Sequence, residues 1–128
     1  MKRNLYYIVD VFGKKKYSGN QLAVVLMTKN ISDKEMQLIA REFNFSETTF
    51  VLPYNKKDKH FSIRIFTPQS EIPFAGHPTL GTAYIINNII LGKPKPSIKL
   101  NLKIGEIPIF FKQDGNRQIL WMQQTQPT

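Results

Sequence analysis

The chain has 128 residues, no cysteine, and two histidines, His60 and His77. Without cysteine there is no disulfide, thiolate metal site or thiol catalysis, and two histidines that lack an H-x-x-x-H spacing argue against a protein zinc site. Hydrophobic residues make up 41% and charged residues 21% of the chain, which is typical of a single folded domain covering residues 1–128.

The net charge of +9, from 18 basic and nine acidic residues, raises the question of nucleic-acid binding. Fourteen of the 18 basic residues are lysines. Six of these lie in turn-like segments, at 14–16 and 56–59, and Lys99 and Lys103 alternate with apolar residues, Leu100 and Leu102. This pattern is typical of solvated faces. We therefore expect no nucleic-acid partner, with RNA or DNA binding as the weaker alternative.

No apolar run reaches the ~18 residues of a membrane span. The longest candidate, residues 83–91, is broken by Asn87 and Asn88. The basic N-terminus lacks the apolar core and the small-residue cleavage site of a secretory signal. We expect a cytoplasmic protein without a membrane partner.

The first predicted elements are two strands, at Leu5–Phe12 and Asn20–Leu26, joined by a turn at Gly13–Gly19. Both strands are rich in aliphatic residues, and the first is also rich in tyrosine, so the pattern favours a hairpin. A helix follows, because Ser32 and Glu35 have the spacing of a capping box. Apolar residues then recur at helical spacing and end before a left-handed asparagine: Met36, Ile39, Ala40, Phe43 and then Asn44.

Strands are predicted next at Ser46–Leu52 and Phe61–Phe66, followed by a helix from about Pro78 to Leu91. Apolar residues cover nearly the whole circumference of this second helix, which predicts burial on all sides. Three further strands are predicted, at Ser97–Ile104, Ile107–Phe111 and Gln118–Met122. About seven strands around one buried helix indicate an α+β fold with a curved, barrel-like, mostly antiparallel or mixed sheet wrapped around a central helix.

The segment Thr67–Thr79 leads from a predicted strand into this second helix. Pro78 suits the first helical position, and Gly76 would let a ligand approach the backbone. His77 then stands at a helix N-terminus, where anions bind, so a small carboxylate is the natural ligand. The alternative is an ordinary helix start with a solvated histidine, and the segment alone does not decide between them.

Five segments carry a resemblance to a known family: Asp10-Val-Phe, Ser18-Gly-Asn20-x-Leu-Ala-Val-Val25, Ala40-Arg-Glu-Phe-Asn-x-Ser-Glu-Thr-Thr-Phe-Val-Leu-Pro53, Arg64-Ile-Phe-Thr-Pro68 and Pro73-Phe-Ala-Gly-His-Pro-Thr-Leu-Gly-Thr-Ala83. In this order they resemble the N-terminal half of the phenazine-biosynthesis PhzF-like family. The resemblance implies one half of a diaminopimelate-epimerase-like fold, in which two similar halves enclose the active site.

The resemblance also implies cofactor-free proton transfer, which in the phenazine enzyme isomerises a dihydro-hydroxyanthranilate ring. It assigns catalysis to Glu47 and His77, and substrate binding to Asn20, Ser46, Gly76, Pro78 and Thr79. A carboxylate in a partly apolar cleft is able to take and return a proton. Taken singly these residues are weak signals, since a lone Glu is usually on the surface and a turn Asn such as Asn20 is commonly structural. Diaminopimelate epimerase and proline racemase share this fold and exchange protons between two thiols. This chain has no cysteine, so it cannot use that mechanism.

Relatives of this family carry a second half with an Asp-Pro-x-Thr-Gly-Ser type motif, and this chain has no such motif. We expect either a half-length protein or the product of a truncated gene. Two functions stay open: an isomerase, or half of one, acting on a small cyclic or amino-acid-like carboxylate, and an inactive half-domain that binds a small anion or a protein partner. The expected partner is a second copy of the chain or a separately encoded second half.

Overall fold

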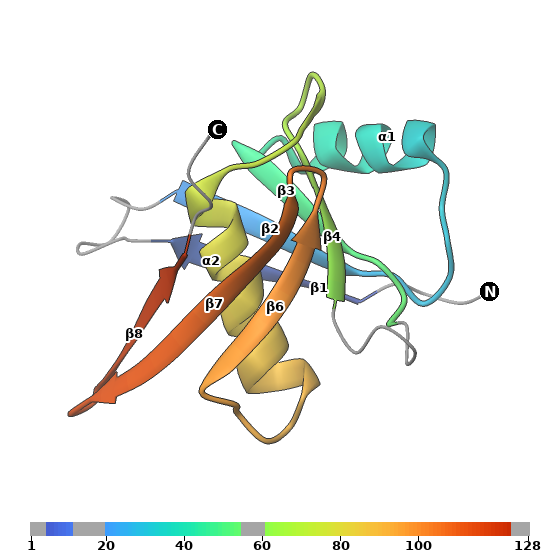
Figure 1. Ribbon diagram of the computed structural model, residues 1–128. Coiled ribbons are helices and arrows are strands. Elements are labelled where there is room, and N and C mark those ends of the chain that lie inside the picture. The colour runs from blue at the N-terminus through green and yellow to red at the C-terminus, as the bar shows by residue number, and fades with distance from the viewer. Residues whose placement is uncertain (1–4, 12–19, 55–60, 124–128) are drawn as a thin grey trace.

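The computed structural model describes residues 5–11, 20–54 and 61–123, and in these ranges eight strands form one sheet (Figure 1). The strands are β1 (Leu5–Val11), β2 (Asn20–Leu26), β3 (Glu47–Val51), β4 (Phe61–Phe66), β5 (Glu71–Ile72), β6 (Ser97–Leu102), β7 (Gly105–Asp114) and β8 (Arg117–Met122). The helices are α1 (Asp33–Phe43) and α2 (Gly76–Ile85), and α2 continues into a π-helical turn, η1 (Ile86–Ile90).

The sheet is mixed and curled, as the sequence predicts. Its order is β1-β2-β3-β4-β6-β7-β8, and β5 pairs with β4 beside this path. The β2–β3 and β4–β6 pairs are parallel and the others are antiparallel. The helix α2 contacts both β1 and β8, which are the two ends of the path, so the sheet bends around this helix (Figure 1).

Each face of the sheet has its own core. On the concave side, α2 and η1 pack against a large cluster of aliphatic residues that includes Val24, Val51, Ile65 and Leu100. On the convex side, α1 packs against a smaller cluster that includes Phe50 and Phe66. The strand β3 lies between the two helices, which explains why four of its five residues are buried.

The expected caps of α1 are present. The Ser32 hydroxyl accepts a hydrogen bond from the Glu35 N–H at 3.1 Å, and Asn44 closes the helix at φ 56°. The Glu35 side chain makes no bond back to Ser32 within the part of the chain that the structure describes, so half of the capping box forms. The amphipathic stripe is confirmed, since Met36 and Ala40 are buried.

The second helix departs from its prediction in three ways. It begins at Gly76, with Ala75 as the N-cap, so Pro78 is its third residue and not its first. Its end is π-helical, with Leu91 N–H bonded to Ile86 O at 3.0 Å. The prediction of burial on all sides is wrong, because Tyr84, Ile89 and Ile90 are 41%, 43% and 37% exposed. In the described part of the chain β1 and β8 do not pair with each other, so the sheet does not close over these side chains.

Strand boundaries differ from the predictions by a few residues. The strand β5 was not predicted, because two residues are too few to show a pattern. Lys103 was expected on the outer face of a strand; it lies instead in the turn after β6 and pairs with Glu71 at 2.9 Å. Phe12 and the predicted lysine turns at 14–16 and 56–59 lie outside the described residues.

Candidate active site

Glu47 is the first residue of β3, and its side chain is half-buried. Because side chains alternate along a strand, Glu47 shares a face with Thr49. The Thr49 hydroxyl lies 2.7 Å from the hydroxyl of Thr82 in α2, so this face looks toward that helix. The carboxylate of Glu47 therefore belongs to the concave side of the sheet, where α2 lies.

The N-terminus of α2 has no side-chain cap. Ala75 is the N-cap residue, and the first turn contains no acidic residue. The first backbone hydrogen bond of the helix runs from the Thr79 N–H to Ala75 O at 3.2 Å. The Gly76 N–H lies before this bond, among the N–H groups at a helix start that have no acceptor within the helix. In α1, by contrast, Ser32 provides the cap and two acidic residues lie in the first turn. The start of α2 is thus the helix end that favours an anion from outside the helix.

Gly76 leaves space beside this helix end. A Cβ at this position would meet the Met122 terminal methyl at 3.8 Å, which is an ordinary van der Waals distance. The backbone does not require a glycine either, because the φ angle of Gly76 is not positive. Neither packing nor backbone conformation therefore requires a glycine at this position.

The pairing of the strands brings the start of α2 to the end of the sheet that holds Glu47. Thr49 pairs with Ile65, and Ile65 pairs with Ile72 of β5. Only residues 73–75 separate Ile72 from Gly76. Figure 1 shows α2 beginning at the end of the sheet where β4 finishes and β3 starts.

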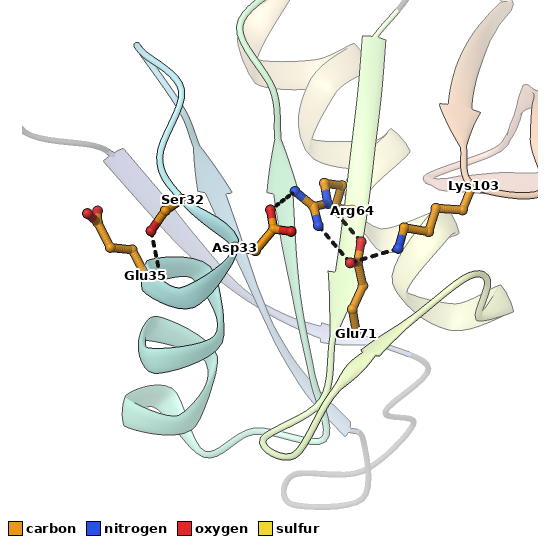
Figure 2. A network of polar contacts seen from close by, with 6 residues as sticks. All are labelled: Ser32, Asp33, Glu35, Arg64, Glu71 and Lys103. Atoms are coloured by element: carbon orange, nitrogen blue, oxygen red, sulfur yellow. Dashed lines mark hydrogen bonds and ion pairs between the residues drawn. The ribbon is translucent and has the colours of Figure 1, made fainter.

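A network of ion pairs holds β5, the last strand before α2 (Figure 2). Arg64 of β4 donates from Nε to Glu71 Oε2 and from Nη2 to Glu71 Oε1, both at 2.7 Å, and from Nη1 to Asp33 Oδ1 at 2.7 Å. Lys103 approaches Glu71 Oε1 at 2.9 Å. The first residues of β4, Phe61–Ser62, pair with β6, and its last residues, Ile65–Phe66, pair with β5. The ion-pair network lies between these two pairings.

The network shifts the titration of its members. The hydrogen bonds from Arg64 hold the pKa of the Glu71 carboxyl below its ordinary value, with a smaller contribution from Lys103. The pKa of Asp33 is lowered as well, mainly by its hydrogen bond with Arg64. The two carboxylates in turn raise the pKa of Arg64. All three groups are therefore charged at neutral pH, and the bidentate Arg64–Glu71 pair joins β4 to β5, the strand that precedes α2.

Among the predicted site residues, Glu47, Gly76 and His77 lie at one end of the sheet. His77 is exposed, and Gly76 is half-buried. Ser46 is exposed and directly precedes β3. The backbone of Asn20 begins β2, two residues before Leu22, which pairs with Glu47. The side chain of Asn20 lies outside the described part of the chain.

Pro78 and Thr79 are buried rather than presented on the surface. The Thr79 hydroxyl donates to Ala75 O at 2.7 Å, so it is engaged with the helix start. These two residues shape the helix N-terminus from inside, and the surface there is formed by Gly76 and His77.

Two contacts around the site escape an analysis of the sequence. The Thr49–Thr82 pair joins residues 33 positions apart, and the Arg64–Asp33 pair joins residues 31 positions apart. The one available signal for the first was local: Thr49 alternates with Glu47, and Thr82 lies one helical turn after Pro78.

Within the described ranges, no helix is long and apolar enough to cross a membrane. No group of three or more histidine, aspartate or glutamate side chains in those ranges is arranged to hold a metal ion.

Comparison with solved structures relates this fold to known proteins. A Bacillus anthracis phenazine biosynthesis protein of the PhzF family matches with a TM-score of 0.81 and 32% identity, covering 97% of this chain and 42% of that one. A hydroxyproline epimerase from Agrobacterium vitis matches with a TM-score of 0.60 and 13% identity, covering 89% of this chain and 39% of that one, which shows a common fold alone.

Comparison of sequences gives the family. The trans-2,3-dihydro-3-hydroxyanthranilate isomerase of Pseudomonas aeruginosa is 42% identical over 126 residues, which are 96% of this chain and 43% of that protein. The chain thus spans less than half the length of the curated relatives that it matches. The profile of the family described as phenazine biosynthesis-like protein matches residues 9–128. The chain belongs to this PhzF-like family, which includes curated relatives named isomerases.

Proposed function

We propose that this chain supplies the acid–base half of an isomerase site that moves a proton between two carbons of a small cyclic carboxylate. The observation that carries the proposal is the placement of Glu47, half-buried on the α2 side of the sheet, at the same end as the uncapped N-terminus of that helix. The Pseudomonas aeruginosa relative, named for a dihydro-hydroxyanthranilate substrate, supports a ring carboxylate as the substrate class.

In this proposal the Glu47 carboxylate removes a proton from one ring carbon and returns it to another. One C–H bond breaks and another forms, so the reaction needs neither oxidant nor cofactor. A single carboxyl group performs both steps because its protonated form is the acid that the second step requires.

The substrate carboxylate binds at the start of α2, where the Gly76 N–H and the helix dipole favour negative charge. His77, exposed beside it, donates a hydrogen bond to the substrate. Ser46 directly precedes Glu47, and the backbone of Asn20 begins the neighbouring strand β2, so we propose both as further polar contacts of the substrate. Pro78 and Thr79 fix the direction of the helix end.

The site is completed by a partner that covers the concave end of the sheet. In this proposal the partner is a second copy of the chain or a separately encoded second half, which would supply what the rest of the matched relatives supplies; this chain covers 43% and 42% of two of them. A second copy brings a second Glu47 and a second His77 to the site.

The test is a chimera in which this chain replaces the matching part of the Pseudomonas aeruginosa isomerase. Deuterium uptake from D₂O into trans-2,3-dihydro-3-hydroxyanthranilate, followed by NMR, reports the proton transfer. We expect Glu47→Gln to lower the rate by about 10²–10⁴, and Glu42→Gln, at an exposed glutamate of α1, to leave it unchanged. We expect His77→Ala to weaken binding of the carboxylate, seen as a higher KM, by more free energy than it removes from the stability of the fold, seen as a lower melting temperature.

Two results would overturn the proposal. One is a chimera that unfolds cooperatively yet shows no exchange while the intact relative is active. The other is a Glu47→Gln variant that exchanges deuterium at the parental rate. Binding of anthranilate without exchange would support the inactive, anion-binding half-domain instead.

A further inference from the structure

Two buried threonine hydroxyls connect the sheet to α2. Thr49 and Thr82 are both 0% exposed, and their hydroxyl oxygens lie 2.7 Å apart. The Thr82 hydroxyl also lies 2.6 Å from Pro78 O, to which it donates. A hydroxyl has one hydrogen, and a carbonyl oxygen only accepts. The direction is therefore fixed: Thr49 donates to Thr82, and Thr82 donates to Pro78 O.

Packing alone does not explain these hydroxyls. The pair lies on the concave side of the sheet, where α2 packs against an aliphatic core that includes Val51 and Ile65. Valine has nearly the same shape as threonine, and replacing both partners of a buried hydrogen bond by apolar groups of the same shape is often neutral for stability. What a valine pair lacks is a preferred direction and distance between the two elements.

The pair joins the two backbones that carry the candidate site. Thr49 follows Glu47 by two residues on the same face of β3, roughly 7 Å along the strand. Pro78 directly follows His77. The hydrogen-bonded chain thus ties the strand end that bears the carboxylate to the first turn of the helix whose N-terminus faces the substrate.

We propose that Thr49 and Thr82 are positioning residues, which hold Glu47 at a fixed place relative to the N-terminus of α2. The catalytic consequence rests on the proposed function above, whereas the positioning itself does not. Displacements of about 1 Å at a reacting group are able to lower rates by 10²-fold, so a pair without contact to the substrate affects turnover.

The same strand provides a matched control. Thr48 is also 0% exposed, but it faces the opposite side of β3, and its hydroxyl has no hydrogen-bond partner in the described part of the chain. Thr48→Val and Thr49→Val make the same chemical change one residue apart, at equal burial. Only the second removes a hydrogen bond to α2.

The first experiment needs no reaction. Amide hydrogen exchange is measured by NMR on the full chain for residues 47–51 of β3 and for residues 79–83, the first hydrogen-bonded amides of α2, in the parent, Thr48→Val, Thr49→Val and Thr49→Ser. We expect Thr49→Val to accelerate exchange at least three-fold in both segments, and Thr48→Val to accelerate it in neither. Thr49→Ser, which keeps the hydroxyl, should restore the parental rates. Equal exchange in the two valine variants would overturn the inference.

The second experiment measures turnover in the chimera described above. We expect Thr49→Val to lower kcat about ten-fold with KM nearly unchanged, Thr49→Ser to recover most of it, and Thr48→Val to behave as the parent. A loss of kcat that serine does not rescue would contradict a role for the hydroxyl. If the parental chimera is inactive but the exchange pattern holds, the proposed function fails and the positioning pair stands.

Discussion

Arg64 donates hydrogen bonds to both carboxylate oxygens of Glu71, each at 2.7 Å. The side chains of Arg64 and Glu71 are 21% and 14% exposed, so the pair is more shielded from water than most surface ion pairs. It joins β4 to β5 just before the chain enters α2. The pair lies on the α1 side of the sheet, opposite the face that bears Glu47.

Replacing Glu71 by glutamine should destabilise the fold by about 1–2 kcal/mol, because a hydrogen bond to a charged group contributes about 1.5–3 kcal/mol when shielded and less with partial exposure. The glutamine amide would also direct N–H groups at Arg64 or Lys103. Urea unfolding of both proteins measures the difference. Asp33→Asn is the control. The side chain of Asp33 is 80% exposed, so loss of its charge beside Arg64 should lower the free energy of unfolding by less than Glu71→Gln does. Equal losses would show that burial of Glu71 does not matter.

The same pair predicts how stability changes with pH. The pKa of Glu71 is lower in the folded chain than its ordinary value, so the unfolded chain binds more protons between the two values. The stabilisation by Glu71 is thus fully present above its ordinary pKa of about 4.3 and is lost as the pH falls through the folded value. Asp33 acts in the same direction.

We expect the difference in unfolding free energy between the parent and Glu71→Gln to be constant from pH 7 to about pH 5 and to shrink below pH 4. Both proteins gain positive charge in acid, so the difference between them isolates Glu71. A gap that stays constant down to pH 3 would mean that Glu71 titrates alike in the folded and unfolded chains.

The sequence predicted the features that depend on residues close together in the chain. Ser32 and Glu35 are three residues apart, so the start of α1 is visible in the sequence, and alternation in residues 61–66 identifies β4. The order of motifs also identified the family and hence the curled sheet. Within β3, however, the sequence did not reveal which face of the strand looks toward α2, and this was settled by the Thr49–Thr82 contact.

Other features depended on tertiary contacts that no local pattern encodes. Arg64 binds Asp33 and Glu71 only because the curled sheet brings β4, β5 and the start of α1 together. The exposure of Tyr84 was missed for a related reason: an apolar helix predicts burial, but whether the surrounding sheet closes depends on pairing between the first and last strands. The helix start was predicted at about Pro78 and lies two residues earlier, at Gly76, while the space around Gly76 depends on Met122 of β8.

Gly76→Ala should leave the stability of the chain unchanged within about 0.5 kcal/mol, since the added methyl meets only the Met122 methyl at van der Waals distance. It should nevertheless weaken anthranilate binding at least five-fold, because the methyl occupies space where the ligand approaches the backbone. Titrations followed by the Gly76 and His77 amide resonances measure the affinity. Gly81→Ala, at a buried position of the same helix, is the contrasting variant, expected to lower stability by overpacking. Unaltered anthranilate affinity in Gly76→Ala would place the ligand elsewhere.

The last prediction concerns self-association. The two outermost strands of the path expose large apolar side chains, with Tyr6 and Ile8 of β1 at 55% and 51% and Ile119 and Trp121 of β8 at 44% and 46%. Trp121 stacks on Phe110 of β7, with ring centroids 5.6 Å apart, so part of the convex surface is an aromatic pair. Unpaired outer strands with apolar side chains favour pairing with another chain.

We expect reversible dimers at micromolar concentration, opposed by the net charge of +9 and therefore strengthened by added salt. Sedimentation velocity at 50 and 300 mM salt measures this. Trp121→Gln should weaken the dimer at least ten-fold, whereas Ile104→Gln, which removes a side chain that is 53% exposed in the turn between β6 and β7, should not. Neither substitution changes charge, so a difference between them reports the apolar surface of β8. A monomer at every concentration, or equal weakening by the two variants, would show that β8 is not the contact.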